Sequence, residues 1–461
     1  MPVFKKIILL SVAIIAAGFG CKGLSADQQA AIRPVKLNYW TVFDDVAQLK
    51  KMATAYNTIH PHVTINIRQV RYDEFDRLFI NALADDVQPD IVSMHTRWLR
   101  NYQARLAPMP PSVKMGKLVL KNSITKDTEV QFDTFNMPTA DVIKRDYLAV
   151  VTEDSVIKNQ IFGLPLSIDT LGIYYNKDLL DKAGIAEAPK TWDEFVEAVK
   201  RVTKLDKDGK IIQSGTSLGT GKNIDNAFDI VSALMMQNGV TMAGPSGAIG
   251  FAGGLEKAGP KHPALQALYF YTDFARPTKE VYSWNETESN AFDAFVRGKT
   301  AFYFGFAYDY GRIKTRAPDL NFETMPLLQL NPSTQANVAN YWLQSVVKKS
   351  KKQNEAWDFI RYLSTADNLK KYSDAVKLPS PLRIHLKAEQ NDPVLANFAS
   401  QLLVAKNWYK GKDIGAAEKG FENMIATILS PADLALTPDK ILERDANAVV
   451  RAAQVAAQTL Q

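Results

Sequence analysis

The sequence predicts an α/β protein, and the order of its first five elements is the main evidence. Strand-like and helix-like segments alternate near the start of the chain, with strands at 36–40, 63–70 and 90–94 and helices at 46–56 and from Asp73 onward. Strands that alternate with helices form a parallel sheet covered on both faces, and ligands bind outside the carboxyl ends of its strands. Residues 41–45 and 95–98 follow the first and third strands, so they are the first places to look for a site.

A second region of helices and strands follows Pro165. Thr191 and Glu194 have the spacing of a capping box, which predicts that a helix begins there. Residues 206–209 have the composition of a hairpin turn, and the glycine-rich stretch 244–259 is expected to be a surface loop. The other expected elements are strands at 171–175 and 300–304 and helices at 292–297 and 355–363.

The composition is that of a globular protein. A chain of 461 residues is long enough for roughly two to four domains. With 46% hydrophobic and 23% charged residues, neither a disordered chain nor a polytopic membrane protein is expected. Subtracting 49 Asp and Glu from 55 Lys and Arg gives +6, and the basic residues are scattered among acidic ones. A nucleic-acid partner is therefore not expected.

The N-terminus has the pattern of an export signal. Residues 1–6 are basic, residues 7–19 are apolar or small, and Gly20 and Cys21 follow. The apolar run is shorter than the roughly 20 residues that span a bilayer, so residues 1–20 are expected to be a removable signal peptide. Cys21 is the single cysteine, which excludes an intramolecular disulfide and a cysteine-rich metal site.

Cys21 stands where a signal peptidase would cut. The junction resembles a bacterial lipobox, which implies that Cys21 is lipidated and that residues 21–34 tether an exported protein to the outer face of the cytoplasmic membrane. The alternative is an uncleaved signal anchor in which Cys21 has no such role.

One motif suggests an enzyme. Residues 215–219 fit the G-x-S-x-G pattern of serine hydrolases, with Ser217 as the nucleophile. His262 and His385 are the histidines that follow it, and residues 220–223 would delay the helix that the motif requires. A flexible loop is therefore the favoured interpretation, and a serine hydrolase is the minor alternative. The sequence gives no reason to expect a metal ion or a cofactor.

Aromatic side chains at the ends of expected elements are a better guide to function. A group of them can form a platform for a ligand, although each one alone is more often a packing residue. Trp192 and Trp357 lie on the apolar faces of expected helices and are assigned to the core. The residues near element ends are Trp40, Trp98, Trp284, Tyr308, Tyr341, Trp342 and Trp408.

Several segments resemble one protein family. The strongest is IFGLPLSIDTLGIYYNKDLL at 161–180, followed by AG at 183–184 and PKTWDEF at 189–195. Further matches are QPDIV at 88–92, FVRGKTAF at 295–302 and NEAWDFIRYL at 354–363. Over Leu37 to about Ile425, the chain resembles bacterial extracellular solute-binding proteins of the maltose-binding protein type.

The resemblance implies a two-lobe periplasmic-binding-protein fold of type II, with a hinge and a ligand cleft between the lobes. Lobe I is then 35–167 plus 338–382, and lobe II is 168–337 plus 383–461. The segment 106–160 is longer than its counterpart in the maltose binder, so its details cannot be transferred.

The resemblance also implies site residues. Trp40 and Asp44 follow the first strand, Arg97 and Trp98 follow the third, and family members contact ligand at these places. The other implied ligand contacts are Asp169 after the first crossing, Asn223 in a loop of the second lobe, Tyr308 where the maltose binder stacks a tryptophan on a sugar, and Trp284, Tyr341, Trp342 and Trp408 in other cleft-facing segments.

The expected function is therefore binding, without catalysis. A monomeric lipoprotein is expected to close on a carbohydrate and deliver it to the permease of an ABC importer. The same fold could instead bind a peptide, a polyamine or an anion, and Arg97 as a carboxylate or phosphate clamp would favour an anion.

Overall fold

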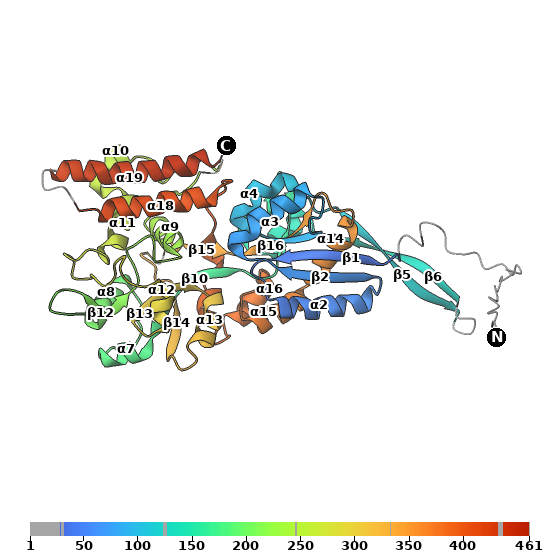
Figure 1. Cartoon of the computed structure of the whole chain (residues 1–461), viewed down its shortest axis with the longest axis horizontal. Helices are drawn as coiled ribbons and strands as arrows, with labels where there is room; N and C mark the ends of the chain where they lie inside the picture. Colours follow the sequence, from blue (N-terminus) through green and yellow to red (C-terminus); the bar gives the residue numbers. More distant parts are fainter. Residues whose placement is uncertain are drawn as a thin grey trace, which may run out of the picture.

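The computed structural model describes residues 28, 32–122, 127–244, 247–331, 333–431 and 437–460. Two lobes, each with its own sheet and apolar core, lie along the long axis of the molecule (Figure 1). Cys21 and the expected signal peptide lie outside the described residues. Within the part of the chain that is described, no helix has the length and apolar character needed to cross a bilayer.

Lobe I contains a sheet with the strand order β2-β1-β3-β16-β4, and β9 also pairs with β16. Its strands are β1 (Val35–Thr41), β2 (Val63–Gln69), β3 (Ile91–His95), β4 (Leu106–Ala107), β9 (Leu164–Pro165) and β16 (Trp342–Val347). β1 runs parallel to β2 and β3, as predicted, whereas β16 is antiparallel to β3. The predicted parallel arrangement of the first three strands is confirmed. β16 was not among the predicted strands, and it is antiparallel because it enters lobe I from lobe II.

The helices of lobe I bury one side against the core. They are α2 (Val46–Ile59), α3 (Tyr72–Ala84), α4 (Leu99–Tyr102), α5 (Ala140–Asp146), α6 (Ala149–Ser155), α14 (Gln353–Leu363), α15 (Ala366–Val376) and α16 (Arg383–Glu389), with short 3-10 turns at Thr96–Trp98 and Gln103–Arg105. We also expected Asp73, as the first residue of this helix, to cap it, and this is wrong: α3 begins at Tyr72, and its N-cap residue is Arg71, whose side chain makes no capping hydrogen bond. Asp73 lies in the first turn of α3, where its negative charge interacts favourably with the positive end of the helix dipole.

Lobe II contains a sheet with the strand order β11-β12-β13-β10-β15-β17, and β14 pairs with β10. Its strands are β10 (Asp169–Asn176), β11 (Lys204–Leu205), β12 (Ile211–Thr216), β13 (Thr300–Phe306), β14 (Phe322–Pro326), β15 (Asn337–Asn340) and β17 (Ala405–Lys406). β12 and β13 are parallel, whereas β10 is antiparallel to β13, β14 and β15. Both sheets are thus mixed.

The helices of lobe II surround this sheet, and α18 and α19 lie together along one side (Figure 1). They are α7 (Lys177–Lys182), α8 (Trp192–Val202), α9 (Ala227–Gln237), α10 (Leu255–Ala258), α11 (Pro263–Asp273), α12 (Ala291–Val296), α13 (Tyr308–Arg316), α17 (Ala396–Ala399), α18 (Ile414–Leu429) and α19 (Pro438–Gln458), with 3-10 turns at Gly259–Lys261 and Leu402–Val404. The stretch expected to be a surface loop at 244–259 includes α10, and Phe251 is fully buried there.

Local signals explain how α8 and the preceding chain are placed. Thr191 is the N-cap of α8 and accepts a hydrogen bond from the Glu194 amide at 3.2 Å. The Glu194 carboxylate accepts from the amide of Lys190 at 2.7 Å, one residue before the position that a capping box requires. The predicted turn at 206–209 connects β11 to β12, and the amide of Asp206 donates to the carbonyl of Lys210 at 2.9 Å.

The chain crosses between the lobes at places set by strand pairing. Residues 166–168 connect β9 in lobe I to β10 in lobe II, and the amide of Ile168 donates to the Pro379 carbonyl at 2.8 Å. Tyr341 separates β15 in the lobe II sheet from β16 in the lobe I sheet, just after the boundary expected at 337/338. A later segment carries the chain from α16 to α17, which packs against β10. The full set of lobe boundaries stays a prediction.

An antiparallel hairpin projects from lobe I away from lobe II (Figure 1). It consists of β5 (Ser112–Asn122) and β6 (Asp127–Asn136), and the short pair β7 (Val156–Ile157) and β8 (Gln160–Ile161) lies further along the chain. Asn354 of α14 binds the base of the hairpin formed by β5 and β6. Its side chain accepts from the Lys114 amide at 2.9 Å and donates to the Lys114 carbonyl at 2.8 Å.

Candidate ligand-binding site

Aromatic rings from both lobes meet where the lobes face each other, and we call this set the interlobe aromatic cluster. Its members are Phe43 after β1, Tyr72 at the start of α3, Trp98 after β3, Trp342 at the start of β16 and Tyr308 at the start of α13. Phe43 is edge-on to Tyr308, with ring centroids 4.7 Å apart, and parallel to Trp342 at 6.3 Å. Phe43 is 42% exposed and Tyr72 is 55% exposed, so these large apolar surfaces remain open to a ligand.

Tyr308 is held in place by a carboxylate at the hinge. No side chain of its own helix caps α13, and Asp169 of β10 accepts hydrogen bonds from the amides of Ala307 at 2.8 Å and Tyr308 at 3.0 Å. The amide of Thr170 donates to the same carboxylate at 2.8 Å. Burial raises the pKa of Asp169 to about 7, and the three backbone donors oppose this rise. Asp169 therefore fixes the backbone from which the Tyr308 ring projects.

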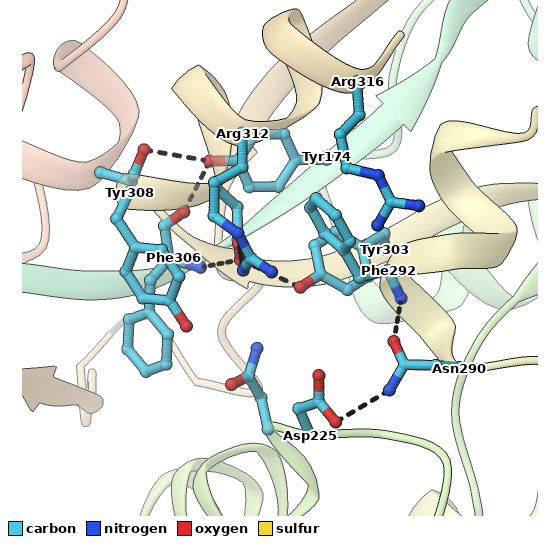
Figure 2. A network of polar contacts seen from close by, with 12 residues as sticks. Tyr174, Asp225, Asn290, Phe292, Tyr303, Phe306, Tyr308, Arg312 and Arg316 are labelled. Atoms are coloured by element: carbon cyan, nitrogen blue, oxygen red, sulfur yellow. Dashed lines mark hydrogen bonds and ion pairs between the residues drawn. The ribbon is translucent and has the colours of Figure 1, made fainter. Parts of the chain in front are cut away.

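A second buried carboxylate supports the same helix. Asp309 accepts from the Tyr303 hydroxyl at 2.9 Å and pairs with Arg312 at 2.6 Å. Figure 2 shows Tyr303 and Arg312 of this network together with Tyr308. Burial raises the pKa of Asp309 to about 6, and Arg312 opposes the rise. The guanidinium of Arg312 lies 5.7 Å from the centroid of the Tyr308 ring, which joins a cation and a ring in one surface.

Polar groups of lobe II lie across from Tyr308 and Arg312. In Figure 2, Asp225 and Asn290 face this pair from the opposite side of the view, and the Asn290 amide donates to Asp225 at 2.8 Å. Asp225 is exposed. The arrangement places hydrogen-bond donors and acceptors beside aromatic faces, which is the chemistry that orients a small polar ligand with apolar faces.

Arg97 reaches from lobe I to lobe II. It forms an ion pair with Asp229 of α9, and its other nitrogen lies 3.6 Å from Glu418 of α18. The guanidinium also lies over the Phe228 ring, 5.2 Å from the centroid. Arg97 therefore lies between the lobes and is engaged by carboxylates of this chain, and its contact with a ligand stays a prediction.

Comparison with known proteins gives these features a family. The model of the bacterial extracellular solute-binding proteins matches residues 40–370. The chain belongs to this family. Its α/β fold is the two-lobe, maltose-binding type that the resemblance implied, since the structure of a cyclo/maltodextrin-binding protein has a TM-score of 0.66 at 15% identity, covering 93% of this chain and 98% of that one.

Relatives and solved structures agree with this assignment. A putative binding protein of Brucella abortus (strain 2308) is 22% identical over 325 residues, which cover 69% of this chain and 68% of the relative. The multiple sugar-binding protein of Streptococcus mutans serotype c is 23% identical over 246 residues, covering 52% and 55%. The structure of an ABC transporter solute-binding protein from Thermotoga lettingae TMO bound with α-D-tagatose has a TM-score of 0.66 at 18% identity, covering 93% of this chain and 100% of that one.

In this solute-binding protein, two further predicted residues belong to the lobe I side. Asp44 is buried and accepts from Thr41 at 2.8 Å, Ser93 at 2.6 Å and Gln344 at 3.3 Å, and burial raises its pKa. Trp40 lies in β1, and the guanidinium of Arg68 covers its ring at 4.9 Å. Asp44 thus ties the loop carrying Phe43 to the strands beneath it.

Four predicted ligand contacts have partners inside the lobes. Trp284 is 1% exposed, and its indole donates to Asn223 at 3.2 Å. Tyr341 donates to Asp154 at 2.6 Å, and Trp408 donates to Ser232 at 3.0 Å. Among the described residues, none of these three aromatic side chains makes a ring contact with the interlobe aromatic cluster. A ligand role for these four residues stays a prediction.

Several residues at the site escaped prediction from the sequence. Phe43 and Tyr72 stand next to element ends and could have been found by the same signal that selected Trp98. Asp229 is an acid within the otherwise apolar first turns of α9, which is an unusual position for a buried carboxylate. Arg312 and Glu418 lie on amphipathic helices among other charged residues, and no local signal distinguishes them.

The structure gives no support to a hydrolase site at Ser217. Its hydroxyl is buried and has no hydrogen-bond partner in the described parts of the chain. His262 caps α11 and contacts the Gly253 carbonyl at 3.1 Å, whereas His385 contacts Ser380 at 2.8 Å. Neither histidine can act as its base in this arrangement. The described residues also contain no cluster of three His, Cys, Asp or Glu side chains suited to a metal ion.

Proposed function

We propose that this solute-binding protein binds a carbohydrate at the interlobe aromatic cluster. The observation that carries the proposal is the contact of Phe43 with Tyr308, in which rings of opposite lobes meet at 4.7 Å. The C–H faces of a sugar pack on aromatic rings, while its hydroxyls need donors and acceptors such as those of Asp225, Asn290 and Arg312. The sugar named with the Thermotoga neighbour and the name of the Streptococcus relative support the same class of ligand.

The proposed role of the bound state is delivery to an ABC permease. Closure of two rigid lobes on a solute changes the surface that a permease meets, so the loaded protein can be distinguished from the empty one. We further propose that the protein is exported as a monomer and held at the outer face of the cytoplasmic membrane by a lipid on Cys21.

Calorimetric titration with a panel of neutral mono- and oligosaccharides tests the proposal, with small-angle scattering before and after addition. At least one sugar is expected to bind and to make the protein more compact. Mass spectrometry of ligands that co-purify with the native protein complements the panel. Absence of binding to every sugar, together with a co-purifying peptide, polyamine or anion, would overturn the carbohydrate assignment.

The anchor has its own test. Cys21→Ser removes the only thiol that could carry a lipid, so the variant is expected to leave the membrane fraction after a carbonate wash. A variant that stays in the membrane fraction would show that residues 1–20 are an uncleaved anchor. This result would leave the sugar site unaffected.

A further inference from the structure

We infer that Arg97 and Asp229 form a latch between the lobes, and that the carboxylates around this latch make the site select uncharged or cationic solutes over anionic ones. The inference rests on the proposed function, because it specifies the charge of the solute that the same site accepts. It replaces the expectation that Arg97 clamps an anionic solute.

The latch connects two bodies that otherwise have separate cores. Arg97 follows β3 in lobe I, whereas Asp229 lies in the first turn of α9 in lobe II. The two side chains are only 10% and 9% exposed. A nearly buried ion pair is little screened by salt, and removing one partner leaves the other charge without compensation. The pair is therefore suited to hold the lobes together when no solute lies between them.

The charge around the latch is negative. The single guanidinium of Arg97 pairs with both Asp229 and Glu418. Asp225 adds an exposed carboxylate on the loop that leads into α9. Burial raises the pKa of Glu418, and the adjacent Arg97 opposes this rise. A cavity of about 280 Å³ beside these groups is lined by Asp225, Phe228 and Glu418.

Lys222, Lys419 and Glu422 also line this cavity, so that three acidic side chains stand against two lysines and the balance stays negative. Lys222 pairs with Glu286 at 3.6 Å, and Lys419 pairs with Glu422 at 2.8 Å. On the lobe I side, burial lowers the pKa of His95 to about 3, and it raises the pKa of Tyr72 to about 12. Both groups are thus uncharged at neutral pH.

An anionic solute would meet this surface at a disadvantage. To bind Arg97 it must displace Asp229, which would leave a buried carboxylate unpaired next to Glu418. An uncharged solute can use the rings of the cluster and leave the ion pair in place, and a cationic solute can use the remaining carboxylate charge. The latch therefore acts as a filter for solute charge.

The test compares the wild type with the double variant Asp229→Asn, Glu418→Gln. The probes are glucose, glucuronate and glucosamine, together with any neutral sugar that the panel identifies and its uronate. Wild type is expected to bind the neutral sugar at least about tenfold more tightly than the uronate, and the double variant is expected to reduce this preference about tenfold by freeing Arg97. Scattering by the unliganded double variant should show a larger radius of gyration than wild type, because the latch is broken.

A matched control changes an Arg–Asp pair that does not join the lobes. Asp293→Asn breaks the ion pair with Arg316, which lies within lobe II at 2.6 Å, and should alter neither solute preference nor compactness. Tighter binding of the uronate by wild type, or an unchanged preference in the double variant, would overturn the filter. An unchanged radius of gyration would overturn the latch. If no sugar binds at all, the proposed function fails, while the scattering result on the unliganded protein still tests the latch.

Discussion

Lobe I and lobe II contribute different chemistry to the same site. Lobe I presents rings at the ends of strands and helices, namely Phe43, Tyr72, Trp98 and Trp342. Lobe II presents a single ring of the cluster, Tyr308, on a helix supported by two buried carboxylates, Asp169 and Asp309. Lobe II also supplies the acids that face Arg97. Lobe I therefore presents mainly apolar surface, whereas lobe II presents the polar and charged groups of the candidate site.

The different hydrogen-bonding requirements of rings and carboxylates explain this difference between the lobes. Aromatic rings at strand ends pack on one another and need few hydrogen bonds, so a cluster of them can remain partly exposed. Buried carboxylates must be surrounded by donors. The N-terminal end of α13 provides backbone amides and Arg312, and β13 adds the Tyr303 hydroxyl. Lobe II is therefore the half in which small changes of charge should matter most.

The largest effect is expected for a core residue away from the site. This variant distinguishes residues that stabilise lobe I from the aromatic residues that lobe I presents to the solute. Trp357 is fully buried in α14, so Trp357→Ala should leave a cavity that lowers the free energy of unfolding by about 3–5 kcal/mol. Affinity for the sugar should stay unchanged at temperatures where the variant is folded. Thermal melts beside calorimetric titration measure both quantities. A large loss of affinity in the folded variant would contradict the separation.

Removing one ring from each lobe tests whether both halves bind the solute. Tyr308→Ala and Trp342→Ala should each weaken binding by about 1–3 kcal/mol, because each removes ring area at the interlobe site. The free energy of unfolding should fall less in these two variants than in Trp357→Ala. Titration of both variants with the same sugar provides the comparison. The site assignment is wrong if both variants keep full affinity and lose stability as Trp357→Ala does.

The sequence predicted elements whose signal is local. The strand predicted at 63–70 and the helix predicted at 46–56 each have apolar residues at the spacing that buries one face, and β2 and α2 form there. The antiparallel entry of β16 beside β3 could not be predicted in this way, because pairing of residues 342–346 with 91–95 depends on the path of the chain through lobe II. Direction of pairing is a property of the whole fold.

The same distinction applies to the site. Trp98, Trp342 and Tyr308 were selected because aromatic residues at element ends are visible in the sequence, and the resemblance supported them. The structure brings their rings into one cluster, while their contact with a ligand stays a prediction. The partner of Arg97 was not found, because Asp229 is 132 residues away and its role depends on how the lobes meet. Asp169 was assigned to ligand contact, whereas the structure shows it bonded to three backbone amides.

The support of Tyr308 by Asp169 predicts a pH-dependent stability. The folded-state pKa of about 7 lies above the ordinary value of 3.8, so the folded protein binds the proton more tightly than the unfolded chain. The contribution of this group is greatest below about pH 4 and falls as the pH rises toward 7. The stability advantage of wild type over Asp169→Asn should therefore shrink as the pH rises over this range.

Urea unfolding of both proteins at several pH values measures this difference. Asp309 titrates in a neighbouring range, since its pKa is raised to about 6, but it is present in both proteins and its contribution largely cancels. A difference that does not vary with pH would show that Asp169 is not neutralised on folding.

The smallest effect is expected for the ring contact between Phe43 of lobe I and Tyr308 of lobe II. Phe43→Leu keeps an apolar side chain on the loop after β1 but removes the ring that lies edge-on to Tyr308 and parallel to Trp342. Edge-to-face and stacked rings contribute about 0.5–1.5 kcal/mol beyond the area they bury, so affinity should fall by about this amount with little change in unfolding. Val42→Leu, one residue earlier and buried in the lobe I core, is the control and should leave affinity unchanged. If Phe43→Leu binds as wild type does, the ring contact between lobes is a consequence of closure and makes no contribution to solute binding.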